Sequence, residues 1–279
     1  VPGIMATRTI SHWRDRWLTM LVAPLMTCSA RLPVYALLIG AFVPQRSVGG
    51  VFNLQGLVLF GLYLMGIVSA MVVAYVVSRR GTGGQLTPLL MELPAYRLPS
   101  LRNIARGLWE RAMIFIKRVG GIILALMVLL WFLSSYPAPP VDYAGPAIDA
   151  SFAGRLGVWL APLFAPLGFD WRIVIALIPA MAAREVVVAA LGTVYALSAS
   201  GDQVADALGG VIGSQWSLAT AMSLLVWFVY APQCVATLAA VKREAGGWRH
   251  AAIVATYLFL LAYVASWLTY RLVLLWSGS

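Results

Sequence analysis

The chain has 279 residues, of which 61% are hydrophobic and only 11% are charged, and its mean hydropathy is +0.86. A soluble globular domain is about half apolar and about a quarter charged, so this composition excludes that class. The apolar runs approach the ~20 residues of a membrane-spanning helix, and they lack the alternating ~10-residue pattern of a barrel strand. The sequence therefore predicts an all-α, polytopic transmembrane helical bundle whose main partner is the lipid bilayer.

The formal net charge of +10 does not indicate nucleic-acid binding. The basic residues lie between apolar runs, as the cytoplasmic loops of a membrane protein require. Both cysteines, Cys28 and Cys234, lie in apolar segments, which argues against a secreted disulfide framework. The chain begins Val-Pro-Gly, without Met and without a signal-peptide pattern, so we expect it to be part of a longer protein.

The first region, residues 1–136, alternates basic and apolar segments. In chain order these are a basic stretch at 1–16, a broken span at 17–43, a polar turn at 45–53, a span at 54–77, a basic stretch at 79–118 and a span at 112–136. The span at 17–43 is unusual because "CSARLP" places a thiol, a hydroxyl, an arginine and a proline inside it. The basic stretches are expected on the cytoplasmic side.

Residues 137–170 are predicted to form an external loop, which lacks Lys and Arg at first, followed by an interfacial helix at 151–169. The last region, 171–279, begins with an apolar segment at 171–197 that contains Pro179, Arg184 and Glu185. Since both flanks of that segment are expected outside, it is predicted to be a re-entrant hairpin, buried in protein or lining a cavity. A span at 216–241, broken near residues 232–234, and a final span at 253–276 follow.

Two parts of the chain resemble each other. "VPGIMATR" at the start resembles "IPAMAAR" ending at Arg184, and "APLMTCSARL" around Cys28 resembles "APQCVATL" around Cys234. The charge bias predicts that the two breaks are crossed in opposite directions. This pattern is typical of inverted repeats, in which discontinuous helices meet near the bilayer midplane and form the substrate site.

The first break has the chemistry of a metal path. Prolines remove backbone donors and free carbonyl oxygens, which are costly in lipid unless something binds them. The available groups besides carbonyls are the Met26 thioether, the Thr27 and Ser29 hydroxyls and the Cys28 thiol. Thiolate and thioether ligands suit a transition metal better than Na⁺ or Mg²⁺, and Arg31 could stabilise the thiolate. The alternative is that each cysteine is only a small packing residue.

The charged residues in apolar surroundings have two interpretations. Intramembrane ionisable residues are expensive, so Arg184 and Glu185 are either functional gating residues or a structural ion pair that fixes the hairpin. Glu92 and Glu244 lie near the predicted cytoplasmic face; either could release a cation, and a solvated loop carboxylate is the simpler account. His12 and His250 are expected to be interfacial rather than metal ligands, and the methionines of the spans are expected to face lipid or pack.

Several motifs together resemble the membrane region of the ferrous iron transport protein B family. They are "VPGIMATR", "CSARLPVY", "MELPAYRLP", "WERAMIFIKRVG", "REVVVAALGTVY" and "QCVATLAAVKRE", in this order along the chain. The resemblance implies a bacterial inner-membrane Fe²⁺ importer with two gate regions. It places the gate cysteines at Cys28 and Cys234, with the first gate region in 1–136 and the second in 171–279.

The resemblance also sets expectations about partners and cofactors. Family members join a GTP-binding domain to the membrane domain, yet this sequence contains no G-x-x-x-x-G-K-[ST]. We therefore expect no enzymatic activity and no permanently bound cofactor, with Fe²⁺ as transported substrate and GTP acting only through an upstream domain. Upstream membrane helices and a homo-oligomer are further expected partners. Ala95 replaces a usual proline, and many members have Lys where this chain has Arg184.

Two rival functions remain open at the level of sequence. One is a gate-domain transporter of another solute, of nucleoside type or for another metal such as Mn²⁺ or Cu⁺, since two thiolates also suit Cu⁺. The other is a membrane scaffold or fragment that transports nothing, in which the polar breaks only hold helices together. The first predicts that serine at both cysteine positions leaves uptake intact, and the second predicts no uptake at all.

Overall fold

The structure is a computed structural model that describes residues 2–48, 52–80, 100–137, 150–181, 184, 186–195, 210–232 and 235–277. Its α-helices are α1 (Pro2–Ala6), α2 (Trp13–Val22), α3 (Leu32–Phe42), α4 (Leu54–Arg80), α5 (Leu101–Ser135), α7 (Phe152–Phe164), α8 (Trp171–Ala180), α9 (Val186–Val194), α11 (Leu218–Tyr230), α12 (Val235–Ala245) and α13 (Trp248–Ser277). Short 3₁₀ helices are η1 (Thr7–Thr9), η2 (Ala23–Leu25), η3 (Ser29–Arg31) and η4 (Ala165–Leu167).

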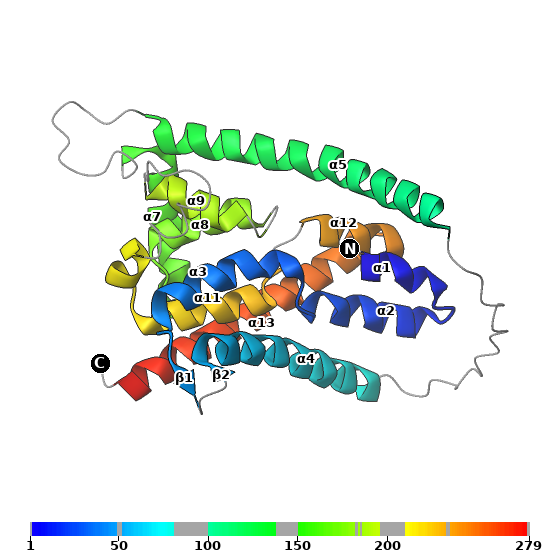
Figure 1. Ribbon diagram of the computed structural model, residues 1–279, viewed down its shortest axis with the longest axis horizontal. Coiled ribbons are helices and arrows are strands. Elements are labelled where there is room, and N and C mark those ends of the chain that lie inside the picture. Colours follow the sequence, from blue (N-terminus) through cyan, green and yellow to red (C-terminus); the bar gives the residue numbers. More distant parts are fainter. Residues whose placement is uncertain are drawn as a thin grey trace.

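The prediction of an all-α bundle is confirmed (Figure 1). The strands of the described residues are two-residue pieces, β1 (Ser47–Val48) and β2 (Phe52–Asn53), which pair antiparallel with Ser47 opposite Asn53. They lie in the polar turn predicted at 45–53. This small hairpin joins α3 to α4 at one end of the bundle.

Three helical segments are long and apolar enough to cross a membrane: Trp13–Phe42, Leu54–Arg79 and Trp248–Trp276. A fourth crossing is possible if α7 with η4 and α8 count as one segment, although they bend by 98° at the intervening turn. All but the last residue of the segment predicted at 112–136 lies within the 35-residue helix α5. The chain is therefore a multi-pass membrane protein.

The two broken helices run in opposite directions. In Figure 1, α2 and α3 lead from the right end of the molecule to its left end, whereas α11 and α12 lead from left to right. Both breaks lie in the middle of the molecule's long axis. This is the arrangement that an inverted repeat of discontinuous helices requires.

The prolines explain where the first break occurs. α2 ends at Val22, the short helix η2 carries Pro24, and the backbone of Met26 and Cys28 is extended, with φ/ψ of −66°/136° and −109°/160°. Pro33 then lies in the first turn of α3, where a missing backbone N–H costs nothing. The segment between η2 and η3 therefore lies outside any regular helix and exposes its backbone groups to other partners.

The segment 171–197, which is predicted to be a re-entrant hairpin, holds two short helices among its described residues. α8 has 10 residues and α9 has 9, and they pack against each other. At about 1.5 Å per residue, each reaches only about half of a ~30 Å hydrocarbon core.

The best-buried helix is α11, which packs along α13. An aromatic cluster joins these helices to the turn between α7 and α8. The Trp227 ring of α11 lies 5.4 Å from the Phe259 ring of α13, 5.6 Å from the Phe164 ring and 5.9 Å from the Phe169 ring, all edge-on. Such edge-to-face contacts add directional packing energy to apolar burial, so α11 has a fixed position in the centre of the fold.

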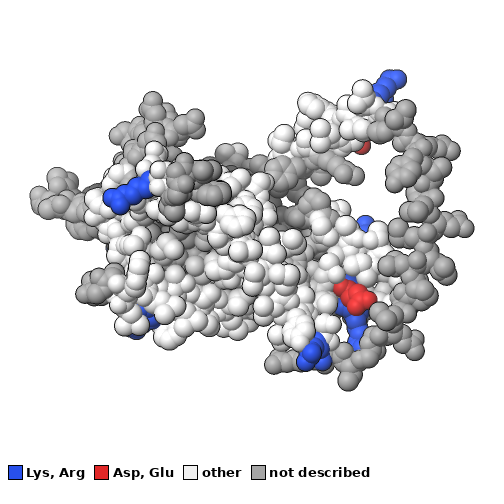
Figure 2. Space-filling model, turned by 60° about the horizontal axis from the view of Figure 1, so that its bottom comes forward, with Lys and Arg blue, Asp and Glu red and all other residues white. Residues whose placement is uncertain are grey.

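Charged side chains lie at the two ends of the molecule. On the face shown in Figure 2, the described Lys, Arg, Asp and Glu side chains lie toward the ends, and the described residues of the broad surface between them are uncharged. Many apolar side chains of α4 and α13 are exposed, among them Phe60, Met71, Leu260 and Leu272. An exposed apolar belt between charged ends is what a bilayer requires of a membrane protein.

Candidate functional site

The first break presents the predicted metal-path side chains in two environments. Cys28 is a free, exposed thiol, and Met26 and Ser29 are also exposed. Thr27 points inward, and its buried Oγ1 has no hydrogen-bond partner among the described residues. An unsatisfied buried hydroxyl in this position can accept or donate to a group that passes through the break.

A glycine of the neighbouring helix allows the first break to approach closely. A Cβ atom at Gly66 of α4 would lie 2.9 Å from Thr27 Oγ1 and 3.3 Å from the carbonyl oxygen of Leu25. It would also reach 4.0 Å from a methyl group of Val229, near the end of α11. The first break therefore lies against α4, close to where α11 stops.

Arg31 is fully buried at the end of η3. Its Nη2 donates a hydrogen bond of 3.3 Å to the carbonyl oxygen of Pro24, whereas Nε and Nη1 have no hydrogen-bond partner among the described residues. Arg184, Tyr35 and Cys28 lie near enough to Arg31 to influence it electrostatically. A guanidinium stays protonated in proteins, so a permanent positive charge sits beside the Cys28 segment.

The tip of the hairpin holds the second break from both sides. α11 ends at Tyr230, and Arg184 Nη2 donates a 2.9 Å hydrogen bond to the carbonyl oxygen of Ala231. On the other side, the backbone N–H of Val235, which begins α12, donates a 3.1 Å hydrogen bond to the carbonyl oxygen of Met181. A helix break leaves carbonyls on one half-helix and N–H groups on the other without partners. The hairpin tip supplies one donor and one acceptor to them.

Several predicted residues lie outside the described part of the chain. These are Cys234 and Glu185, together with Glu92 of the basic stretch. The convergence of the Cys28 and Cys234 sulfur atoms and the Arg184–Glu185 ion pair therefore stay predictions. Among the described residues, no three His, Cys, Asp or Glu side chains lie close enough to hold a metal ion together.

The two elements matched in the internal repeat occupy different settings. Arg184 is buried and contacts the second break, whereas the side chain of Arg8, its counterpart in "VPGIMATR", is 56% exposed. Arg8 Nε instead donates to Glu244 Oε2 at 2.6 Å. In the first break, Arg31 occupies the role that Arg184 has in the second, because each donates to a carbonyl of the local Ala-Pro pair.

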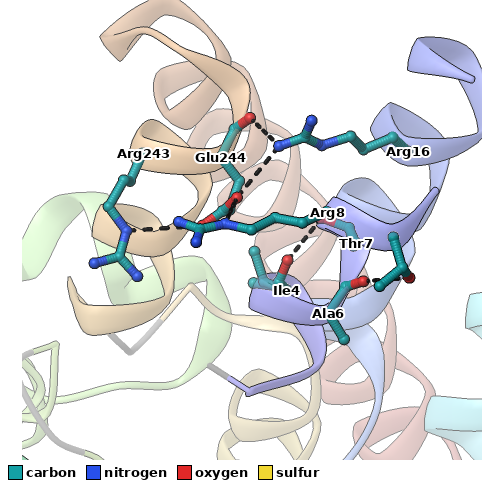
Figure 3. A network of polar contacts seen from close by, with 8 residues as sticks. Ile4, Ala6, Thr7, Arg8, Arg16, Arg243 and Glu244 are labelled. Carbon is teal, nitrogen blue, oxygen red and sulfur yellow. Dashed lines mark hydrogen bonds and ion pairs between the residues drawn. The ribbon is translucent and has the colours of Figure 1, made fainter. Parts of the chain in front are cut away.

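Glu244 forms the centre of a charged network at the end of α12 (Figure 3). Its Oε2 accepts hydrogen bonds from Arg8 and from Arg16 Nη2, the latter at 3.2 Å, and Arg16 also donates 2.7 Å to its carbonyl oxygen. Arg243 Nε lies 3.7 Å from Oε1. The expectation of a solvated loop carboxylate at Glu244 is wrong, since its side chain is only 2% exposed. Arg8 and Glu244 lie 236 residues apart in the sequence, so no local sequence pattern could indicate this ion pair.

The network affects the ionisation of Glu244. The hydrogen bond from Arg8, with the positive charges of Arg8, Arg243 and Arg16, lowers the pKa of the Glu244 carboxyl below its ordinary value, against a smaller opposing effect of burial. A hydrogen bond within the N-terminal segment, from Thr7 Oγ1 to Ile4 O at 2.6 Å, holds the backbone next to Arg8. The carboxylate thus ties the N-terminal segment to the end of α12 at the basic end of the molecule.

His250 lies beside this network in an aromatic setting. Its ring makes edge-on contacts with Trp13 at 5.6 Å and Trp17 at 4.9 Å between ring centres. The expectation that His250 is an interfacial residue stays a prediction.

Two family models match the chain. The model described as "Ferrous iron transport protein B C terminus" matches residues 59–111, and the model "Gate: Nucleoside recognition" matches residues 116–248. The second match includes the hairpin and the second break. The first includes most of α4 and the beginning of α5.

Curated relatives match nearly the whole chain. It is 38% identical to the Fe(2+) transporter FeoB of Leptospira interrogans over 99% of the chain and 42% of the relative. It is 38% identical to the Methanocaldococcus jannaschii FeoB, over 95% of the chain and 38% of the relative. It is 36% identical to a Fe(2+) transport protein A/FeoB fusion protein of Porphyromonas gingivalis, over 98% of the chain and 36% of the relative.

The chain thus spans about two fifths of the length of these relatives. No solved structure matches it. The two family models and the relatives agree with the motifs of the gate regions and with the helical membrane fold. The chain belongs to the ferrous iron transport protein B family and corresponds to a C-terminal part of its membrane region.

Proposed function

We propose that this chain is the membrane permease part of a bacterial Fe²⁺ importer of the inner membrane. Fe²⁺ passes between the broken helices that carry Cys28 and Cys234. The observation that carries this proposal is the pair of oppositely directed helix breaks, one holding the Cys28 thiol and the other capped by the hairpin tip. The names of the relatives, which are Fe(2+) transporters, support iron as the cargo.

The chemistry of the first break suits a dehydrated transition-metal ion in transit. Carbonyl oxygens, the Thr27 hydroxyl and a Cys28 thiolate form a mixed oxygen and sulfur set, which favours Fe²⁺ over Na⁺ or Mg²⁺. Binding releases the thiol proton, and the Arg31 charge stabilises the resulting thiolate. The ion sheds water at the external mouth and leaves at the basic end, which we assign to the cytoplasm.

The coupling and the partners belong to the same proposal. GTP acts through an upstream GTP-binding domain, this chain performs no chemical reaction of its own, and it holds no permanent cofactor. Upstream membrane helices complete the path, and the importer assembles as a homo-oligomer. The fusion found in the Porphyromonas gingivalis relative suggests Fe(2+) transport protein A as a further partner.

The test is Fe²⁺ uptake by the full-length gene product in a strain that lacks its own ferrous uptake. Cys28→Ser and Cys234→Ser are compared with Ala36→Ser, which adds a hydroxyl at an exposed position of α3 outside the break. We expect both cysteine variants to lose most uptake and Ala36→Ser to keep it. Full uptake in the double cysteine variant would contradict the sulfur path.

One observation favours a second candidate, a gate-domain transporter of another solute. The matching gate model carries the description "Nucleoside recognition". Competition for uptake by nucleosides, Mn²⁺ or Cu⁺ separates the cargoes, and nucleoside competition with cysteine-independent uptake would support this candidate. No uptake of any of these solutes would support the scaffold.

A further inference from the structure

The two breaks share a contact that neither the family models nor the names of the relatives describe. In each break, a buried arginine donates a hydrogen bond to a carbonyl oxygen of the Ala-Pro pair that starts the break. Arg31 donates to Pro24 O at 3.3 Å, and Arg184 donates to Ala231 O at 2.9 Å. The arginines come from different elements, η3 and the hairpin tip. One contacts the proline and the other the alanine of the repeated Ala-Pro pair, so the acceptors are one position apart in the repeat.

Both arginines are buried where charge is expensive. Arg31 is 0% exposed and Arg184 is 7% exposed. Their charges also repel each other, because the two groups are neighbours. A guanidinium at each carbonyl also places a positive charge where a cation would reach the break, and that charge acts on the cation.

The carbonyl oxygens involved are the ones that a passing cation would use. Carbonyls at helix breaks coordinate cations in transporters with discontinuous helices, because their oxygen dipoles replace hydration water. A guanidinium that occupies such an oxygen carries the same sign of charge as the cargo. It satisfies the carbonyl while the path is empty, and it repels an arriving Fe²⁺.

We infer that Arg31 and Arg184 are tethered cations that hold the two breaks closed, and that Fe²⁺ enters only by displacing their guanidinium groups from the carbonyl oxygens of Pro24 and Ala231. This inference rests on the proposed function, since it assigns gating residues to the same path. An ion passes a break only if its binding free energy to these oxygens and to the Cys28 thiolate exceeds the free energy lost when the arginine hydrogen bond breaks. The breaks are therefore selective for ions that bind these groups strongly. The two arginines are positioning residues, because they act through the carbonyls.

The test is the equilibrium affinity for Fe²⁺ of the full-length protein in lipid nanodiscs, measured anaerobically with radioactive iron. Arg31→Gln and Arg184→Gln keep a hydrogen-bond donor but remove the charge. We expect each to bind Fe²⁺ about tenfold more tightly, because a repelling charge a few ångströms from the ion is gone. Arg31→Lys and Arg184→Lys keep a tethered positive charge and are expected to restore the affinity of the unchanged protein.

Two controls separate charge at the breaks from other effects. Arg172→Gln removes an arginine of α8 that lies over the Trp171 and Tyr195 rings at 5.3 and 5.4 Å, away from both breaks, and should leave affinity unchanged. Because Arg31 also stabilises the Cys28 thiolate, its variants are measured again in a Cys28→Ser background. In that background no Cys28 thiolate is present, so removing the Arg31 charge can change Fe²⁺ affinity only through the loss of its repulsion.

Each outcome decides between the alternatives. Tighter binding in the glutamine variants, with lysine and Arg172→Gln unchanged, supports the inference. Unchanged or weaker binding by folded Arg184→Gln, and by Arg31→Gln in the Cys28→Ser background, would overturn it and leave the arginines as structural caps. Absence of Fe²⁺ binding by every variant and by the unchanged protein would instead overturn the proposed function, and the inference with it. Arg184→Gln decides the question if Arg31→Gln does not fold.

Discussion

Arg8 Nε lies 2.6 Å from Glu244 Oε2, so the first turn of the chain is bonded to the end of α12, 236 residues later. Arg16 at the beginning of α2 contacts the same carboxylate. Through one acid, the segment that leads into the first break is connected to the segment that leaves the second. The basic end of the molecule therefore couples both broken helices.

Replacement of Glu244 by Gln should destabilise the protein. The amide keeps one acceptor oxygen, but it loses the charge that Arg8, Arg16 and Arg243 surround, and charge-assisted hydrogen bonds are the stronger kind. We expect a loss of about 1–2 kcal/mol of folding free energy, visible as a lower melting temperature in detergent. The control is Glu110→Gln on α5, an exposed carboxylate, which should leave the melting temperature unchanged.

The same carboxylate predicts an acid sensitivity. The pKa of Glu244 is lowered from an ordinary value of 4.5, because the folded state binds the ionised form. The stabilisation is therefore fully present above that ordinary value and is lost as the pH falls through the lower pKa of the folded state. The melting temperatures of the unchanged protein and of Glu244→Gln should differ at neutral pH. They should converge once the pH falls below the pKa of Glu244 in the folded state. A constant difference down to strongly acid pH would contradict this assignment.

Gly66 should tolerate no side chain. A methyl group there would lie 2.9 Å from Thr27 Oγ1 and 3.3 Å from the Leu25 carbonyl, so Gly66→Ala must push the first break away from α4. We expect a loss of about 1–3 kcal/mol in stability, together with reduced Fe²⁺ uptake. Gly61→Ala on the same helix is the matched control, because its Cβ would meet nothing within 4 Å. Equal effects of the two substitutions would show that the close approach at Gly66 is unimportant.

Gly168 and Gly246 separate two reasons why a position requires glycine, which are a left-handed backbone and a lack of space for a side chain. Both have left-handed backbone, with φ of 78° and 75°, which costs a side-chain-bearing residue about 1–2 kcal/mol. A methyl group at Gly246 would meet no neighbour, whereas at Gly168 it would collide with the Tyr270 ring of α13. Gly168→Ala should therefore lower the melting temperature clearly more than Gly246→Ala does. Equal losses would indicate that only the backbone conformation matters there.

Local features of the chain predicted much of the fold. Hydropathy and the length of apolar runs indicated a multi-pass helical membrane protein, and the turn at 45–53 appears as the β1–β2 hairpin. Prolines marked both helix breaks, and the apolar segment at 171–197 contains the short helices α8 and α9. These properties depend on a residue and its near neighbours, so they can be read from the sequence.

The candidate site was predictable only in part. The motif around Cys28 identified the first break, and a gate model matches residues 116–248, which include the second break. The first gate region stays a prediction. Nothing in the sequence indicated that Arg184 would reach Ala231, or that Met181 would accept from Val235. Those bonds join segments that are distant along the chain, and their geometry depends on how deeply the hairpin enters the bundle.

Glu244 is a second residue whose contacts the sequence did not indicate. Its neighbours Lys242 and Arg243 suggested a solvated cytoplasmic turn, yet the N-terminal turn covers it and Arg8 pairs with it. By itself, the sequence determined the membrane setting, the helix breaks and the family, because apolar length, proline and motif order are local. Only the tertiary structure decided which charge meets which carbonyl or carboxylate, since such pairs form where packing buries them together, whatever their separation along the chain.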